Sequence, residues 1–300
     1  MFEPEVILGI IDKTINNNVV FGDLLSPDDK YSLIKKSLIR TSEPGEILCT
    51  QNQYNNTLFL IISGEVEIRA VSNGNETSLS KLGEGELVGE ISALFMTPCI
   101  ATATVTQPSV VLEISYEVFS NILSNNVEIQ NIFNKRCKNR IIETTLRCAP
   151  IFDTLDKQSF NEICYVSSVV TVKKDNVIAT EDKMEKNMYV IGSGTARVYI
   201  TIDGKEITIA FLQSGDYFGE YSLFIGDARC ASVSALTDMQ LVLLQGEAFE
   251  SFIEYNEETE NQINQEAIER KQSLDRMRYN LTTRQAAEHQ LSHIQNRLSM

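Results

Sequence analysis

The sequence has no pair of cysteines at CxxC spacing, only two histidines, and few basic residues. Its six cysteines lie far apart, so we expect reduced, mostly buried thiols rather than a disulfide or zinc framework. Lys and Arg number 26 against 41 Asp and Glu, and the resulting net charge of −15 disfavours unspecific binding to nucleic acid or to an anionic membrane. We expect neither as a partner, although this charge still allows a local basic site.

Long apolar runs are also missing. No stretch approaches the roughly 20 apolar residues that a membrane-spanning helix needs, and the N-terminal residues are acidic where a signal peptide would be basic. The sequence contains no Walker loop, HExxH motif or nucleophile elbow. These absences predict a cytoplasmic protein that is not an enzyme and holds neither a metal nor another cofactor.

What the chain does contain is a repeat. An offset of 130 residues aligns its two halves without a gap over a long stretch, and chance matches would not keep one offset across so many positions. A chain of 300 residues also suits two domains. The matched pairs include Gly64 with Gly194, Leu82 with Leu212, Gly85 with Gly215, Gly89 with Gly219, Glu90 with Glu220, and Ser92 with Ser222.

Each copy predicts the same order of elements. An amphipathic helix opens it, with Ser26 or Asp28 as N-cap candidates in the first copy and Asp156 in the second. Short strands punctuated by Gly, Asn and Asp follow, and a helical stretch closes the copy. We expect an α+β, mainly β, fold of two jelly-roll-like β-barrels flanked by helices. The expected parts are an N-terminal helical segment (1–19), a first domain (20–147), a second domain (148–258) and a C-terminal helical tail (259–300).

The most strongly repeated segment carries the chemistry. In the second copy, Gly219 and Glu220 end a loop and open a short apolar helix, and Arg229 follows nine residues after Glu220. Free backbone N–H groups at a helix start and a guanidinium both favour an anion. A carboxylate for a ribose hydroxyl beside a cation for a phosphate describes a nucleotide site. An internal ion pair between Glu220 and Arg229 is the structural alternative.

The segment resembles the phosphate-binding cassette of cyclic-nucleotide-binding domains, whose pattern is roughly FGE, an apolar residue, Ala or Ser, Leu, and then PRAATV. Ala228 replaces the usual proline. The tandem layout is similar to that of regulatory subunits of cAMP-dependent protein kinase and of cGMP-dependent kinase, over about residues 20–260. The resemblance implies that Gly219 and the helix amides hold the cyclic phosphate, Glu220 takes the ribose 2′-hydroxyl, and Arg229 pairs with an exocyclic oxygen. The implied site residues are Phe218, Gly219, Glu220, Tyr221, Ser222, Arg229, Cys230 and Ala231.

The first copy departs from this pattern because Cys99 stands where the second copy has Arg229. Losing a charge-assisted contact to phosphate costs about 1.5–3 kcal/mol. We therefore expect a degenerate first site, unless a cation arrives from elsewhere in the fold. The aromatic residue that follows LDK and caps the first site in the kinase subunits is Gln158 here. The degenerate site comprises Gly89, Glu90, Ile91, Ser92, Cys99, Ile100 and Ala101.

Base choice and partners follow from the remaining residues. Members selective for cGMP often have Thr or Ser after the arginine, whereas Cys230 stands there and favours cAMP. Tyr255 and Tyr279 are candidates by type alone to stack on the base. A pair of tail histidines, His289 and His293, is expected on an ordinary solvated face.

The tail shows apolar residues at three-and-four spacing, with an expected break at Asn280–Thr283. Such a stripe packs on the parent domain or, as the sharper alternative, on a partner helix. The positions are Ile263, Ala267, Leu274, Met277 and Leu281 before the break and Ala287, Leu291, Ile294 and Leu298 after it.

These features together predict a tandem cyclic-nucleotide sensor without an effector domain. Ligand in the second site would let the helices after residue 246 swing over the pocket, and the tail would then offer or hide a face for a protein partner. The tail is too short for a helix-turn-helix domain, and residues 1–25 contain no arginine for a kinase-inhibiting segment. The alternatives are an interaction scaffold with decayed nucleotide sites and a kinase regulatory subunit without the usual inhibitor segment.

Overall fold

The computed structural model describes residues 9, 11–15, 25–72 and 74–298, with side chains described as far as residue 283. The apolar tail positions beyond Leu281, together with His289 and His293, therefore have no described side chains. Of the expected N-terminal helical segment, residues 9 and 11–15 are helical, and the remainder of 1–19 lies outside the described residues.

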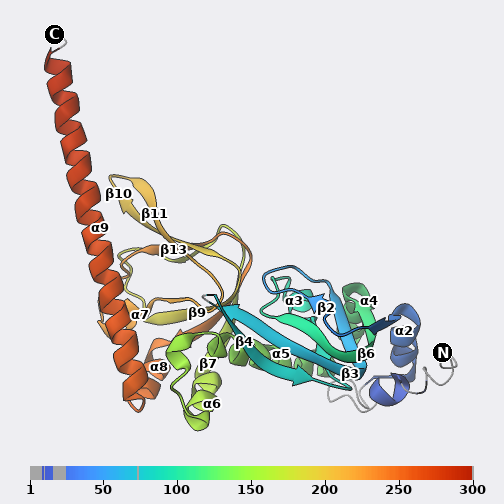
Figure 1. Ribbon diagram of the computed structural model, residues 1–300. Coiled ribbons are helices and arrows are strands. Elements are labelled where there is room, and N and C mark those ends of the chain that lie inside the picture. Colours follow the sequence, from blue (N-terminus) through green and yellow to red (C-terminus); the bar gives the residue numbers. More distant parts are fainter. Residues whose placement is uncertain (1–8, 10, 16–24, 73, 299–300) are drawn as a thin grey trace.

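The elements of the first copy recur 130 residues later in the second, which confirms the repeat (Figure 1). Ser26 and Asp156 cap the opening helices by accepting from the N–H groups of Asp29 and Ser159, as the sequence predicts. The matched helices are α2 (Pro27–Lys36) with α6 (Lys157–Val166), α3 (Glu90–Phe95) with α7 (Glu220–Phe224), α4 (Tyr116–Asn125) with α8 (Gly246–Ile253), and α5 (Val127–Arg147) with the start of α9 (Glu257–Leu298).

The first copy forms one sheet of antiparallel strands in the order β1-β6-β3-β4, with β2 on β6 and β5 on β3. Its two longest strands pair with each other along most of their length, and β3 begins with a run of five buried apolar residues, Leu58 to Ile62. The strands are β1 (Leu38–Ser42), β2 (Ile47–Cys49), β3 (Thr57–Ser72), β4 (Asn75–Leu82), β5 (Leu87–Val88) and β6 (Thr102–Ser115).

The second copy divides the same strands between two four-stranded sheets, ordered β11-β10-β13-β8 and β12-β9-β14-β7. The counterpart of β3 is interrupted at residues 194–195 and forms two strands, although Gly64 within β3 has a φ of +98°, close to the +92° of Gly194. The expectation of closed barrels is not met, since hydrogen bonding among the described strands does not close either copy into a ring. The strands are β7 (Ser167–Val172), β8 (Val177–Ala179), β9 (Asn187–Ser193), β10 (Ala196–Ile202), β11 (Lys205–Leu212), β12 (Tyr217–Phe218), β13 (Ser232–Ala235) and β14 (Met239–Gln245).

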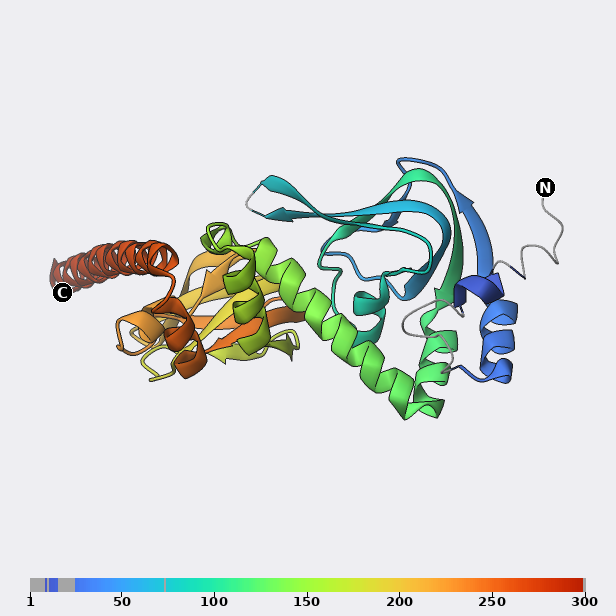
Figure 2. The same ribbon diagram turned by 90° about the horizontal axis from the view of Figure 1, so that it is seen from below.

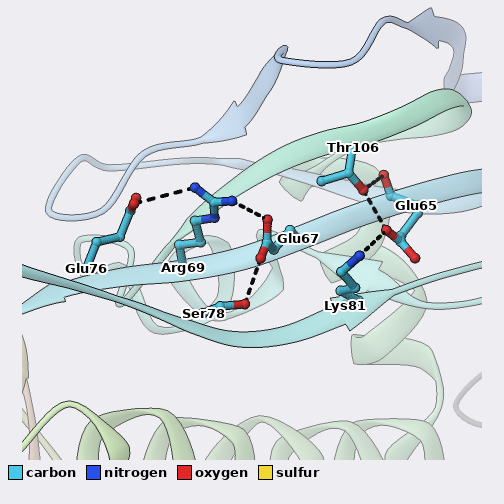
Figure 3. A network of polar contacts seen from close by, with 7 residues as sticks. All are labelled: Glu65, Glu67, Arg69, Glu76, Ser78, Lys81 and Thr106. Atoms are coloured by element: carbon cyan, nitrogen blue, oxygen red, sulfur yellow. Dashed lines mark hydrogen bonds and ion pairs between the residues drawn. The ribbon is translucent and has the colours of Figure 1, made fainter.

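A network of ion pairs and hydrogen bonds fixes the long β3–β4 hairpin of the first copy (Figure 3). The buried carboxylate of Glu67 accepts from Arg69 at 2.6 Å and from the Ser78 hydroxyl at 2.7 Å. Glu65 accepts from Lys81 across the strand pair at 2.9 Å. These contacts join β3 to β4 on the face that the apolar core does not occupy.

The helix α5 joins the two copies and packs against β7, β9 and β14 of the second (Figure 2). One continuous apolar core includes residues of both copies, such as Ile141 on α5 and Val190 on β9. A buried hydrogen bond of 2.7 Å from Thr97 Oγ1 to Gln240 Oε1 also crosses the interface. The loop that follows α3 in the first copy therefore touches a central strand of the second.

The tail helix α9 runs for 42 residues without the break expected at Asn280–Thr283. The hydroxyls of Thr282 and Thr283 donate to the carbonyls of Arg278 and Tyr279 one turn earlier, so these residues fit the helix rather than end it. The far end of α9 projects beyond the second copy (Figure 1). No helix among the residues that the structure describes has both the length and the apolar composition to cross a membrane.

Candidate functional site

The tight turn from β12 into α7 depends on Gly219. Its φ of +94° lies in the left-handed region that favours glycine, and it takes the N-cap position of α7. A Cβ at this position would lie 2.3 Å from Nη1 of Arg229 and 2.4 Å from the carbonyl oxygen of Asn187. The turn and the arginine therefore fit together only because residue 219 has no side chain.

Arg229 is a buried cation with incomplete compensation. Only 4% of the residue is exposed; Nη1 donates to Gly219 O at 2.9 Å, and Nη2 donates to Asn187 O at 2.6 Å. Its Nε finds no hydrogen-bond partner among the described residues, and the nearest carboxylate oxygen, on Glu185, is 3.7 Å away. Burial lowers the pKa of the guanidinium, but an arginine of this kind still stays protonated at neutral pH.

Glu220 does not pair with Arg229, so the alternative drawn from the sequence, an internal ion pair between these two residues, is wrong. The residue is 5% exposed, and its Oε1 accepts from Nη1 of Arg270, on α9, at 3.1 Å. The same nitrogen donates to Tyr217 O at 2.9 Å. Burial lowers the pKa of Arg270, but the neighbouring charge of Glu220 leads the contacts that raise it, and the net shift is upward.

The tyrosine of β12 ties α9 to the sheet at a second point. The Tyr217 hydroxyl donates to Glu266, and the Arg270 guanidinium lies over the Tyr217 ring at 4.4 Å from its centroid. Burial and the hydrogen bond to Glu266 raise the pKa of Tyr217, so the ring keeps its proton throughout the physiological range. One face of α9 is therefore held against the turn that carries Glu220.

A pocket of about 340 Å³ lies between this turn, the strands and α9, within the size range of small-molecule sites. One end carries Arg229 and Glu220, and the other is mostly apolar. All eight residues that the resemblance implied line it. The complete lining is Ala179, Val198, Ile209, Ala210, Leu212, Tyr217, Phe218, Gly219, Glu220, Tyr221, Ser222, Arg229, Cys230, Ala231, Val233, Ala267, Arg270, Lys271, Ser273, Leu274 and Met277.

The sequence analysis expected the helices after residue 246 over the pocket, but it did not assign Arg270, Leu274 or Met277 to the lining. The candidates chosen by type, Tyr255 and Tyr279, are instead strongly exposed and lie outside the lining. One signal was available, because Arg270 stands 130 residues after another arginine, Arg140.

The matching pocket of the first copy is much smaller, about 70 Å³. All seven residues expected there line it, and Cys99, which is 4% exposed, holds the place of the second copy's arginine. A cation does arrive from elsewhere: Arg140, on α5, donates to Glu90 at 2.5 Å and to Leu87 O at 2.9 Å. Those are the contacts of Arg270, so Arg140 does not take the place that Arg229 has in the second copy.

Gln158 gives the first pocket no cap. It is exposed, donates to Glu162 at 3.0 Å, and lies outside the lining of the first pocket. The first copy thus lacks both the cation and the capping aromatic that the resemblance associates with a ligand.

Comparison with known proteins agrees with the repeat. The family model for the cyclic nucleotide-binding domain matches twice, at residues 39–126 and 169–256. These matches cover more than half of the chain and are again offset by 130 residues.

Curated relatives resemble this chain over most of its length. A cAMP-dependent protein kinase regulatory subunit of Yarrowia lipolytica is 25% identical over 241 residues, which is 80% of this chain and 60% of the relative. The corresponding protein of Debaryomyces hansenii is 27% identical over 241 residues, covering 80% and 50%. The chain therefore spans only about half to three fifths of the length of these relatives. Among solved structures, the regulatory domain of Toxoplasma gondii PKA with cAMP matches with a TM-score of 0.42 and 19% identity, over 89% of this chain and 99% of that one.

Proposed function

This chain belongs to the cyclic nucleotide-binding domain family, and we propose that its second domain holds the ligand and prefers cAMP to cGMP. The observation that carries the proposal is the Arg229 guanidinium in the wall of a pocket of ligand size, a buried cation whose Nε has no hydrogen-bond partner among the described residues and whose ion pair with Glu185 is long, at 3.7 Å. Burying a charge with so little compensation is costly unless a counter-charge joins it. The counter-charge that we propose is the cyclic phosphate.

Each polar group at that end of the pocket has a role in the proposal. The phosphate lies between Arg229 and the first-turn amides of α7, which have no partner within the helix. Gly219 lets it approach the backbone closely. Arg270 engages Oε1 of Glu220, and in the part of the chain that the structure describes the other oxygen is left for the ribose 2′-hydroxyl.

The apolar end of the pocket suits a purine, and its chemistry supports adenine over guanine. Side chains such as Val198, Ile209, Leu274 and Met277 offer packing surface but no hydrogen bonds. The thiol of Cys230, which follows Arg229, is a weak donor and gives little to the exocyclic groups of guanine. The exocyclic groups of guanine would stay unpaired in this surrounding, and buried polar groups left unpaired weaken binding. Adenine is therefore favoured.

The signal passes through α9 in this proposal, because the ligand and the helix share one carboxylate. Residues 267–277 of α9 line the pocket, and Arg270 fastens the helix to Glu220. A ligand that binds Glu220 changes that attachment, and the projecting end of α9 then offers or hides a face for a protein partner. Such coupling requires the ligand to bind more tightly in one position of α9 than in the other.

The test is calorimetric titration of the whole chain with cAMP and with cGMP. Wild type is expected to bind cAMP at one site per chain and cGMP more weakly. Arg229→Gln is expected to lose about ten- to a hundredfold in affinity, the value of one charge-assisted contact. The matched control is Arg197→Gln, which removes an arginine of β10 that pairs with Glu206 and lies outside the pocket lining.

Three outcomes would contradict the proposal. Unchanged affinity of Arg229→Gln for cAMP would remove Arg229 from the site, and two comparable sites would mean that the first pocket also binds. No heat with either nucleotide, with an unchanged melting temperature, would favour the scaffold with decayed sites.

A role in regulating a kinase is the second candidate, and the name shared by the matched relatives favours it. The expected observation is co-purification of this chain with a protein kinase catalytic chain that is released by cAMP. Retention of the complex at saturating cAMP would argue against this candidate and leave the nucleotide-binding proposal untouched.

A further inference from the structure

Two of the six cysteines meet in the first pocket. Cys49 and Cys99 both line it, and their counterparts in the second copy, Ala179 and Arg229, line the second pocket. The first copy therefore differs at both positions in the same way, by carrying a thiol.

The backbone holds these two residues against each other. Cys49 ends β2, opposite Ala103 of β6. The segment that carries Cys99 is hydrogen-bonded to the turn directly after Cys49, with Cys99 N donating to Gln53 O at 2.9 Å and Asn52 N donating to Cys99 O at 2.8 Å. Both side chains line the same small pocket, so the two thiols face a common space across these paired segments.

We propose that Cys49 and Cys99 are a redox-active thiol pair that two-electron oxidants such as hydrogen peroxide convert to a disulfide within the first pocket. This inference does not depend on which nucleotide the second domain binds.

The two thiols differ in pKa, and oxidation by peroxide begins at the thiol that ionises more readily. The hydrogen bond from Cys49 is the main cause that lowers the pKa of Cys99, and the Ser92 hydroxyl acts in the same direction. That hydrogen bond, together with burial, raises the pKa of Cys49. The charge of Glu90 and burial oppose the Cys99 thiolate, yet the net shift is downward, so Cys99 is the thiol that ionises first.

The other cysteines are less suited to react. Burial raises the pKa of Cys148, Cys164 and Cys230 to about 11 and that of Cys137 further still. Since the thiolate is the nucleophile, oxidation is expected to select Cys99 over these four.

Access is limited to small molecules. Cys49 is partly exposed, and the pocket of about 70 Å³ that Cys99 lines has room for more than one water molecule. Hydrogen peroxide fits such a space, whereas a bulky alkylating reagent does not.

The chemistry proceeds in two balanced steps. The Cys99 thiolate attacks one oxygen of hydrogen peroxide, the O–O bond breaks, and the hydroxide released takes up a proton as water, leaving a sulfenic acid on Cys99. The Cys49 thiol then attacks that sulfur, the S–O bond breaks, and a second water leaves as the disulfide forms. Overall two thiols are oxidised, one peroxide is reduced to two waters, and a dithiol reductant reverses the change.

The test uses the whole chain in its native state. After brief exposure to hydrogen peroxide, the protein is acid-quenched, denatured and alkylated, and its mass and non-reducing peptide map are recorded. Relative to the reduced protein alkylated in the same way, the expected mass is lower by the mass that two alkylations add and by about 2 Da more, and the map should contain one peptide that links Cys49 to Cys99. Dithiothreitol is expected to restore both thiols.

Two variants make the result specific. Cys49→Ser keeps a hydrogen-bond donor toward Cys99 but removes the second thiol, so a sulfenic acid should then persist on Cys99 and be trapped by dimedone added together with the denaturant. Cys164→Ser is the matched control and should form the link as wild type does. A different cysteine pair, an unlinked Cys99 sulfinic acid in wild type, or full alkylation of all six thiols would overturn the proposal.

Discussion

Arg140 and Arg270 lie 130 residues apart and make the same two contacts. Each guanidinium binds the buried glutamate of its own copy and the carbonyl oxygen of the residue three positions before that glutamate. Both arginines stand outside the segments that match the family model. The repeated unit therefore includes the closing helix. The glutamate is bound to that helix in both copies, in the second, which has Arg229, and in the first, which has Cys99 at the matching position.

The Arg140 contact predicts a cost in stability. Arg140→Met leaves Glu90, which is 4% exposed, as an uncompensated buried charge. Breaking a buried pair costs a few kcal/mol, and partial exposure of the arginine reduces this to roughly 2 kcal/mol. The measurement is the free energy of unfolding in urea.

Two further variants control that experiment. Lys138→Met, at an exposed position of the same helix, should have little effect. Adding Glu90→Gln to Arg140→Met should recover part of the loss. Equal effects of Arg140→Met and Lys138→Met would mean that the ion pair contributes nothing.

Gly219 and Gly226 give a matched pair of glycine substitutions. Both have positive φ, +94° and +78°, but a Cβ at 219 meets Arg229 and Asn187, whereas at 226 no atom of the described chain lies within 4 Å. Gly226→Ala is expected to lower the free energy of unfolding by about 1 kcal/mol, the cost of holding an alanine at positive φ. Gly219→Ala should in addition displace Arg229 and abolish cyclic-nucleotide binding. Melting temperature and calorimetry measure the two effects, and binding by Gly219→Ala at wild-type affinity would refute the close approach.

The buried hydrogen bond between Thr97 and Gln240 predicts strong non-additivity. Gln240→Leu alone leaves the Thr97 hydroxyl buried without its partner, which costs about 1–3 kcal/mol. Gln240 Nε2 is itself unpaired within the described part of the chain, and its penalty disappears equally in the single and in the double variant, so the Thr97 hydroxyl alone distinguishes them. Thr97→Val with Gln240→Leu should therefore be less destabilising than Gln240→Leu alone. A double-mutant cycle in urea measures the coupling, and simple additivity would exclude an energetic link across the interface.

The hairpin network of Figure 3 predicts a pH dependence. The hydrogen bond from Arg69 is the main cause that holds the pKa of Glu67 below its usual value of 4.5. A carboxyl whose pKa is lowered on folding stabilises the protein above its unfolded pKa and loses that contribution as the pH falls through the folded pKa. The stability difference between wild type and Glu67→Gln should therefore be constant near neutral pH and shrink below about pH 4.5.

Urea unfolding across a pH series measures this dependence. Glu76→Gln, at a more exposed carboxylate 3.4 Å from the same arginine, should give a smaller difference throughout. A difference for Glu67→Gln that does not change between neutral and acidic pH would contradict the assignment.

The sequence predicted the cassette well because its residues are close together along the chain. Phe218 to Ser222 and Arg229 to Ala231 all line one pocket, and their relative positions are fixed by one tight turn and one short helix. The contribution of Arg270 was missed because it depends on how a distant helix folds back, which short-range patterns do not reveal.

The errors have physical causes too. The break expected at Asn280–Thr283 does not occur, since the threonine hydroxyls bond within the helix. Short strands punctuated by Gly, Asn and Asp predicted sheets, but such a pattern does not reveal which strands pair at the sheet edges. Barrel closure was therefore expected where the hydrogen bonding leaves the sheets open. The domain boundaries and the partner of the tail stay predictions.

The helix α9 has 42 residues where its counterpart α5 has 21, and the added half extends about 30 Å at 1.5 Å per residue. Its attachment to the second domain is concentrated near the pocket, at Glu266, Arg270 and Arg278. If ligand in the pocket tilts this helix as proposed, each 10° of tilt about these attachments moves the free end by about 5 Å. A displacement of that size equals the spacing between neighbouring strands of a sheet.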